Sequence, residues 1–169
     1  EHFPTLPALE GALIGTAATA MKYKGRDDLL VISMPYGATV AGVFTSSKCY
    51  SAPVGWCREL LKKKGNAKAL LVNAGNANAF TGEAGDKAMF STIKTVANQF
   101  SCDEEQVYVA STGVIGEVLD EKLINNQIMT TAETLSANQW EAAAKAILTT
   151  DTFAKASTKT AKIGDHKVT

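Results

Sequence analysis

Short apolar runs of the kind that form buried strands recur along the sequence. Two of these runs, at residues 29–34 and 39–45, flank residues 35–38, whose proline and glycine favour a turn. The simplest pairing of the two runs is an antiparallel hairpin. Further strands are predicted within residues 10–25, where loops flank the strand, and at residues 67–73 and 106–111.

Apolar residues also recur with helical spacing, most clearly at residues 83–100, where Met89, Ile93 and Val96 share one face. A second helix is predicted at residues 51–65, because proline stands near its first turn, and lysines and a glycine stand at its end. Two more helices are predicted at residues 120–135 and 138–150, and the second of these is rich in alanine.

Strand and helix signals are mixed over the whole sequence, with no internal repeat and no low-complexity linker. Residues 158–169 add a Gly-Asp turn between residues that tolerate strands, which predicts a hairpin. The length of 169 residues and the apolar fraction of 46% suffice for one hydrophobic core. We therefore expect a single α/β or α+β domain of layered sheets and helices over residues 1–169.

The charge balance and the length of the apolar runs indicate which kinds of partner to expect. The 17 basic and 17 acidic residues balance, so net charge favours neither nucleic acid nor an anionic membrane as a partner. The apolar runs are far shorter than the roughly 20 residues of a membrane span, and the N-terminal residues do not resemble a secretory signal. We expect a cytoplasmic protein whose partner is a small molecule or another protein.

The cysteines and histidines exclude several kinds of site. Cys49, Cys57 and Cys102 contain no Cys-x-x-Cys spacing, which favours reduced thiols over disulfides or zinc. His2 and His166 are the only histidines and lie near the two ends of the sequence. Neither histidine is well placed in the sequence to activate a serine or cysteine nucleophile. We therefore expect no metal site and no self-contained hydrolase.

Residues 73–82, NAGNANAFTG, lie between a predicted strand and a predicted helix. Such a loop can present backbone N–H groups to an anion, but its glycine spacing matches neither common nucleotide-binding motif. A structural explanation covers part of the segment: Gly75 and Gly82 provide positive φ, and Thr81 is suited to cap the following helix.

The asparagines of this segment need a further explanation. Asn73, Asn76 and Asn78 each carry donors and an acceptor, and buried amides usually belong to a hydrogen-bond network. Such a network orders either a loop or a ligand site, and the residue types do not distinguish the two.

Two other segments offer polar groups. Thr112 and Gly113 follow a predicted strand and provide a hydroxyl and an unshielded N–H, the donors that an oxyanion hole uses. A plain turn explains the same residues. Thr149 and Thr150 end the alanine-rich helix and suit either capping or binding to a polar ligand.

Together, these segments closely resemble the N-terminal part of the ornithine acetyltransferase family of arginine biosynthesis. The resemblance rests on AGVFTSSKCYSAPV at residues 41–54, followed by NAGNANAFTG, by STGVIG at residues 111–116 and by LTTD at residues 148–151. It extends from about Ala12 to Lys167.

The resemblance implies a fold similar to N-terminal-nucleophile hydrolases and a precursor that cleaves itself. The new N-terminal threonine of the second, beta chain would carry the acetyl group from N2-acetylornithine to glutamate by ping-pong catalysis. Its own α-amine, with a reference pKa of roughly 7.7–8.0, would be the base, so no histidine is required. The resemblance implies no cofactor and leaves open whether acetyl-CoA also serves as acetyl donor. It also implies an α/β heterodimer that pairs again into a heterotetramer.

The resemblance also implies roles for individual residues. The oxyanion hole falls on Thr112 and Gly113, and the substrate-binding threonine falls on Thr149, with its neighbour Thr150 as the alternative. A site scaffold is assigned to four residues of the Asn-Ala-Gly segment, namely Asn73, Gly75, Asn76 and Asn78.

The family pattern includes two further segments that this sequence does not contain. A Lys-Gly-x-Gly-Met segment and an Ala-Thr cleavage point are absent, and Thr169 lacks the residues expected before the nucleophile. We therefore expect this alpha chain to be inactive by itself. Two alternatives stay open, a related self-processing aminopeptidase with water as acceptor and a non-catalytic domain that binds a small polar ligand.

Overall fold

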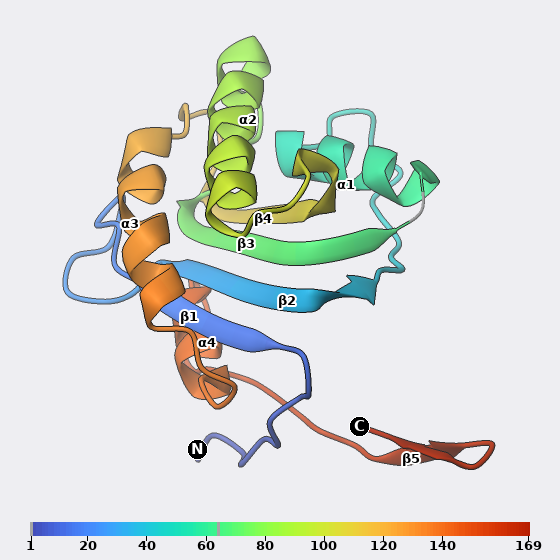
Figure 1. Cartoon of the computed structure of the whole chain (residues 1–169). Coiled ribbons are helices and arrows are strands. Elements are labelled where there is room, and N and C mark those ends of the chain that lie inside the picture. The colour runs from blue at the N-terminus through green and yellow to red at the C-terminus, as the bar shows by residue number, and fades with distance from the viewer. Residues whose placement is uncertain (1, 64) are drawn as a thin grey trace.

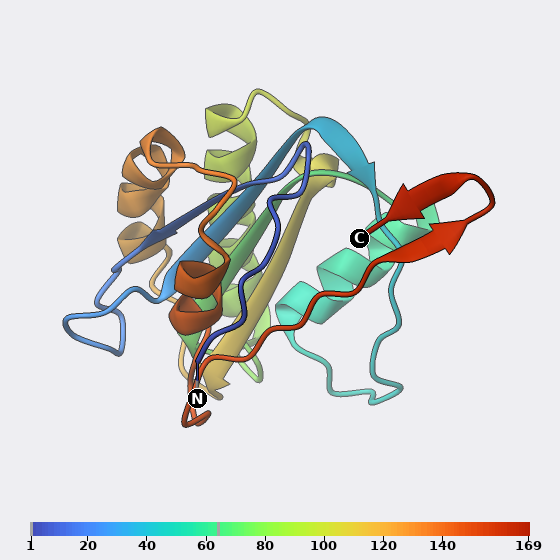
Figure 2. The same ribbon diagram turned by 90° about the horizontal axis from the view of Figure 1, so that it is seen from below.

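The computed structural model describes residues 2–63 and 65–169, which form one main sheet with helices on both faces (Figure 1). The sheet consists of β1 (Leu13–Ala17), β2 (Leu29–Thr39), β3 (Asn66–Asn76) and β4 (Val107–Val114). The helices are α1 (Ala52–Lys63), α2 (Gly82–Gln99), α3 (Glu121–Glu133) and α4 (Trp140–Ala146), and a 3-10 turn covers Glu104–Gln106. A separate hairpin of β5 (Ala161–Ile163) and β6 (His166–Val168) extends away from the sheet (Figure 2).

The strand order is β1-β2-β3-β4, with antiparallel pairs β1–β2 and β2–β3 and a parallel pair β3–β4. The parallel pair is connected through α2, as a crossover connection requires. Its register places Asn73 beside Ser111 and Gly75 beside Gly113. Two of the candidate segments therefore meet at the carboxyl ends of neighbouring strands.

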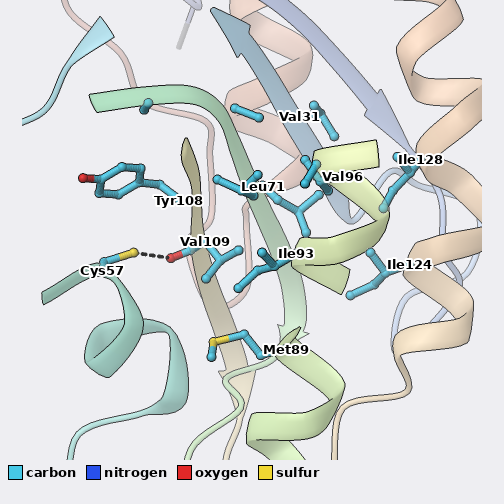
Figure 3. Close-up of a cluster of buried hydrophobic side chains, with 14 of the residues drawn as sticks. Val31, Cys57, Leu71, Met89, Ile93, Val96, Tyr108, Val109, Ile124 and Ile128 are labelled. Carbon is cyan, nitrogen blue, oxygen red and sulfur yellow. Dashed lines mark hydrogen bonds between the residues drawn. The ribbon is translucent and has the colours of Figure 1, made fainter. Parts of the chain in front are cut away.

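Alternating residues of the strands build two hydrophobic layers. Val31 and Leu71 face the main core, where they pack with Ile93 of α2 and Ile124 of α3 (Figure 3). Leu30 points to the opposite face and packs in a smaller cluster with residues of β1 and α4. The period of two residues in the strands thus separates the two layers.

The short helix α4 packs on β1 and β2 and leaves the same face of β4 less covered. Ala110, two residues before Thr112, is exposed, and Thr112 is half-buried. Side chains alternate between the two faces along a strand, so the side chains of both residues point to the face on which α4 packs. The Thr112 side chain therefore lies on the open part of this face.

The predicted hairpin over residues 29–45 is wrong. A single strand, β2, runs through residues 35–38 and ends at Thr39. Its register against β3 shifts between Ser33 and Ala38, and Gly37 has a φ of +79°. The proline and glycine thus form an irregularity within one strand, which is a common place for them at a bulge, and they do not reverse the chain.

The other predicted elements are confirmed, with changed bounds. The helices predicted at residues 51–65, 83–100 and 120–135 correspond to α1, α2 and α3, and the C-terminal hairpin is present. The helix predicted at residues 138–150 is shorter, because α4 ends at Ala146. The strands β3 and β4 are longer than predicted, since their parallel pairing continues into the Asn/Gly and Thr-Gly segments.

Candidate functional site

The carboxyl ends of β3 and β4 form the candidate site. Gly113 has a φ of +136° and lies against Gly75, which has a φ of +104°. A Cβ atom on Gly113 would lie 2.3 Å from the backbone carbonyl carbon of Gly75, inside contact distance. Only glycine permits this approach, so the residue type at position 113 is fixed by backbone packing as well as by conformation.

The direction of the Gly113 backbone follows from its neighbours in β4. The carbonyl of Val109 accepts a hydrogen bond from Cys57 Sγ of α1 at 3.2 Å, so it faces away from β3 (Figure 3). The carbonyl of Val114 accepts one from the N–H of Ala77 at 2.8 Å and faces the β3 side. Backbone groups alternate in direction along a strand, so residues 109 and 113 point to the same side. The N–H of Gly113 therefore faces the open edge, as the carbonyl of Val109 does.

Thr112 offers a hydroxyl on the open part of the sheet face, and the next residue, Gly113, offers an N–H at the adjoining edge. Gly113 is exposed and the adjacent Thr112 is half-buried, so neither is enclosed by the described part of the chain. A hydroxyl beside an outward N–H is the donor set that stabilises a tetrahedral oxyanion. The pair therefore has the two donor groups that the predicted oxyanion hole requires.

The first part of the asparagine network joins β3 to β4. Asn73 is 3% exposed, and its Nδ2 donates to the carbonyl of Asn76 at 2.9 Å, while its Oδ1 accepts from Ser111 Oγ at 2.6 Å. Asn76 is 4% exposed, and its Nδ2 donates to the carbonyl of Glu117 at 2.9 Å. These contacts connect the residues on both sides of Gly113 to β3.

The second part of the network involves Asn78, which is 1% exposed and has a φ of +45°. Its N–H donates to Asn76 Oδ1 at 2.7 Å and its Nδ2 donates to the carbonyl of Gly85 at 3.0 Å. Thr81 Oγ1 donates to Asn78 Oδ1 at 2.8 Å. The amide oxygen and nitrogen of all three asparagines are therefore engaged within the chain, and the network orders the loop itself.

The predicted side-chain cap by Thr81 is wrong. Thr81 occupies the N-cap position of α2, but its side chain makes no hydrogen bond to the first turn. Its hydroxyl instead donates a hydrogen bond to Asn78 Oδ1. The predicted positive φ values of Gly75 and Gly82 are confirmed, at +104° and +57°.

The third candidate segment follows α4. Thr149 is half-buried and Thr150 is exposed. The preceding carbonyl, that of Leu148, accepts a hydrogen bond from Arg26 in the loop between β1 and β2. That loop ends at Asp28, whose carbonyl accepts from the N–H of Ala74, the register partner of Thr112. The β1–β2 loop thus connects the threonine segment with the sheet end that carries Thr112 and Gly113.

Two large cavities lie in the part of the chain that the structure describes. One, of about 680 Å³, lies between α1 and the start of α2 and is lined partly by Trp56, Asn78 and Phe80. Another, of about 650 Å³, lies along α4 and is lined partly by Arg26 and Thr152. Neither cavity includes Thr112 or Gly113 in its lining.

The thiols and acidic residues offer no alternative chemistry in the part of the chain that the structure describes. Burial raises the pKa of the Cys57 thiol, so the reactive thiolate is disfavoured. Cys49, Cys57 and Cys102 are all free. Residues 2–63 and 65–169 contain no group of three or more His, Cys, Asp or Glu placed to hold a metal ion. No helix among them is both long and apolar enough to cross a membrane.

The layered sheet and helices define a mixed α/β domain of the N-terminal-nucleophile type, as predicted from the resemblance. The chain belongs to the ArgJ family, whose profile matches residues 13–169. It is 49% identical over 98% of its length to the arginine biosynthesis bifunctional protein ArgJ of Bradyrhizobium diazoefficiens, and 48% identical over its whole length to that of Agrobacterium fabrum. The chain spans 40% and 41% of the length of these two curated relatives.

Solved structures support the same fold. The ArgJ protein of Bacillus halodurans superimposes with a TM-score of 0.81 at 32% identity, covering 94% of this chain and 83% of that one. The ornithine acetyltransferase of Mycobacterium tuberculosis, solved in complex with ornithine, gives a TM-score of 0.79 at 30% identity and covers 85% of this chain and 78% of that one. The resemblance first recognised in short motifs therefore extends to the whole fold.

Proposed function

We propose that this chain is the alpha part of a glutamate N-acetyltransferase that moves the acetyl group of N2-acetylornithine to glutamate in arginine biosynthesis. Membership of the ArgJ family supports this function, as does the similar ornithine acetyltransferase that was solved with ornithine. The observation that carries the proposal is the Thr112–Gly113 donor pair at an open end of the sheet, next to an asparagine loop that is hydrogen-bonded within the chain.

In the proposed first half-reaction, a threonine hydroxyl of the beta chain attacks the acetyl carbonyl of N2-acetylornithine. The carbonyl oxygen gains negative charge in the tetrahedral intermediate, and the Thr112 hydroxyl and the Gly113 N–H donate hydrogen bonds to it. The proton of the threonine hydroxyl passes through the α-amine to the leaving nitrogen, so ornithine departs as a neutral amine before it takes up solvent protons. An acetyl-threonine ester remains.

In the second half-reaction, the amine of glutamate attacks the ester carbonyl and the same two donors stabilise the oxyanion. The ester bond breaks, the threonine oxygen regains its proton, and N-acetylglutamate leaves. No cofactor takes part in either half. Acetyl-CoA in place of N2-acetylornithine would form the same ester with release of the thiol, and it is a second acetyl donor to be tested.

The remaining residues have supporting roles in this proposal. Thr149 binds the substrate, with Thr150 as its neighbouring alternative, and Asn73, Gly75, Asn76 and Asn78 form the scaffold behind the oxyanion donors. The nucleophile and the open side of the site come from the beta chain of the same precursor, with two alpha and two beta chains in the assembly. We place this enzyme in the cytoplasm.

The proposal is tested with the purified full-length gene product, N2-acetylornithine and glutamate. We expect ornithine and N-acetylglutamate to form in equal amounts. Release of ornithine without N-acetylglutamate, at the same rate with and without glutamate, would instead indicate a hydrolase of the aminopeptidase type. Binding of ornithine without any turnover would indicate a non-catalytic ligand-binding domain.

A further inference from the structure

Arg26 joins two segments that are 122 residues apart in the sequence. Its Nη2 donates a hydrogen bond to the carbonyl of Leu148, the residue directly before Thr149. Its guanidinium also lies over the ring of Tyr23, 3.8 Å from the ring centroid. The planar group is thus fixed by a stacking contact and a directional hydrogen bond at the same time.

The loop that carries Arg26 is itself held on the sheet. The buried carboxylate of Asp28 accepts from the N–H of Thr19 at 2.6 Å, and Thr19 Oγ1 accepts from the N–H of Met21 at 3.2 Å. The backbone carbonyl of Asp28 accepts from the N–H of Ala74 at 2.8 Å. Arg26 therefore projects from a frame that is continuous with β3, the strand that supports Gly113.

Stability alone is a poor explanation for an arginine at this place. Its Nε is buried and has no hydrogen-bond partner among the described residues. A buried donor without a partner is unfavourable, and an apolar side chain of similar volume would fill the space without that penalty. An apolar side chain would not, however, donate a directional hydrogen bond to the Leu148 carbonyl.

We propose that Arg26 is a positioning residue, which holds residues 149–151 against the β1–β2 loop so that the Thr149 hydroxyl is presented to the amino-acid substrate. This inference rests on the proposed function and assigns a role outside the segments that resemble the family motifs. Arg26 touches no reacting atom. It acts through the backbone of Leu148, and its loss leaves the threonine segment, which has no helix or strand of its own, without this bond.

The chain contains a matched control for this contact. Arg58 of α1 donates from Nη2 to the carbonyl of Thr45 at 2.6 Å, and its guanidinium lies 4.6 Å from the centroid of the Tyr50 ring. This second arrangement has the same chemistry as that of Arg26, Tyr23 and Leu148. It holds the exposed segment before α1, away from residues 149–151.

The test compares Arg26→Ala, Arg26→Lys and Arg58→Ala in the full-length enzyme. Ornithine affinity is measured by calorimetry, acetyl transfer is measured by kinetics, and amide exchange is followed over residues 148–152. We expect Arg26→Ala to weaken ornithine binding by roughly tenfold, as loss of a charge-assisted hydrogen bond does, and to raise KM more than it lowers kcat. Exchange over residues 148–152 should become faster. Arg26→Lys should restore part of the affinity, and Arg58→Ala should leave affinity and this exchange unchanged.

The proposal is overturned if Arg26→Ala binds ornithine as the wild type does, or if Arg58→Ala loses as much affinity as Arg26→Ala. Should Arg26→Ala fail to fold, Arg26→Lys decides in its place. Wild-type affinity and wild-type exchange rates in the lysine variant would then contradict the role. Weaker ornithine binding together with faster exchange over residues 148–152 would support it. A wild-type enzyme that neither binds ornithine nor transfers acetyl contradicts the proposed function itself, which separates the two failures.

Discussion

At the scale of single residues, the candidate site consists of a hydrogen-bonded asparagine loop beside Thr112 and Gly113. Asn73, Asn76 and Asn78 each donate a hydrogen bond from their side-chain amide to a backbone carbonyl of the chain. Thr112 and Gly113 stand at the edge that the loop supports. The polar groups that hold the loop and those that face outward are therefore different residues.

We predict that Thr112→Ala in the full-length enzyme lowers kcat by about 10²–10³, because one donor to the oxyanion is lost. Substrate affinity should change little, since the donor acts mainly on charge that develops in the intermediate. Steady-state kinetics with N2-acetylornithine and glutamate measure both quantities. Thr130→Ala, at an exposed position of α3, is the control. An unchanged kcat in Thr112→Ala would remove Thr112 from the oxyanion hole.

Residue-level roles were only partly predictable from the sequence. The surplus of amides indicated a network, but loop order and ligand contact stayed indistinguishable until the partner atoms were known. Thr81 had the residue type and position of a helix cap, yet its hydroxyl donates a hydrogen bond to Asn78. Arg26 gave no signal at all, because its partner Leu148 is 122 residues away and a carbonyl has no sequence pattern.

At the scale of elements, local patterns predicted helices better than strand pairing. The helices α1, α2 and α3 carry apolar positions at helical spacing and were predicted close to their observed positions. Residues 35–38 have the composition of a turn, but they lie within β2, because pairing with β3 on both sides of the irregularity keeps the strand extended. That pairing is tertiary, so the local sequence does not specify it.

Close packing between β1 and α3 provides a test at this scale. A Cβ atom on Gly15 would lie 2.8 Å from the backbone carbonyl oxygen of Thr131 and 3.0 Å from Leu135 Cδ2. We predict that Gly15→Ala lowers the free energy of unfolding by about 1–3 kcal/mol, because α3 must shift away from the sheet. Denaturant unfolding measures the change.

Gly42→Ala is the matched control for this substitution. Its Cβ atom would meet Leu61 Cδ1 at an ordinary 3.5 Å, so we expect little change in stability. Equal stability of Gly15→Ala and wild type would show that α3 does not press on β1 as closely as described.

At the scale of the whole molecule, the stability should depend on alkaline pH. Burial is the largest cause that raises the pKa values of Cys57, Cys102 and Tyr108. The folded state therefore favours their protonated forms, and the unfolded state releases these protons at lower pH. This contribution to stability is complete below the usual thiol pKa of 9.0 and is lost as the pH rises toward the raised values.

We accordingly predict that the free energy of unfolding falls as the pH rises above 9.0, and that Cys57→Ala reduces the slope. Unfolding by denaturant between neutral and alkaline pH, under reducing conditions, measures it. A slope that Cys57→Ala leaves unchanged would show that this thiol does not titrate differently in the folded and unfolded states.

The layered α/β class was predicted from the mixed strand and helix signals, and the family was predicted from the order of four short motifs. Each motif has a plain structural explanation, and only their combination indicated the family that the matching profile and the solved structures then showed. In the proposed function, the other side of the site comes from the beta chain. The chain spans about 40% of the length of its curated relatives.

The central claim is that Thr112 and Gly113 serve a threonine nucleophile that a second chain of the same precursor provides. The most direct measurement is the intact mass of the purified full-length product before and after exposure to N2-acetylornithine without glutamate. We predict two chains, the second beginning with threonine and gaining one acetyl group, which glutamate then removes. A single uncleaved chain, or two chains without an acetyl group on that threonine, would contradict the account.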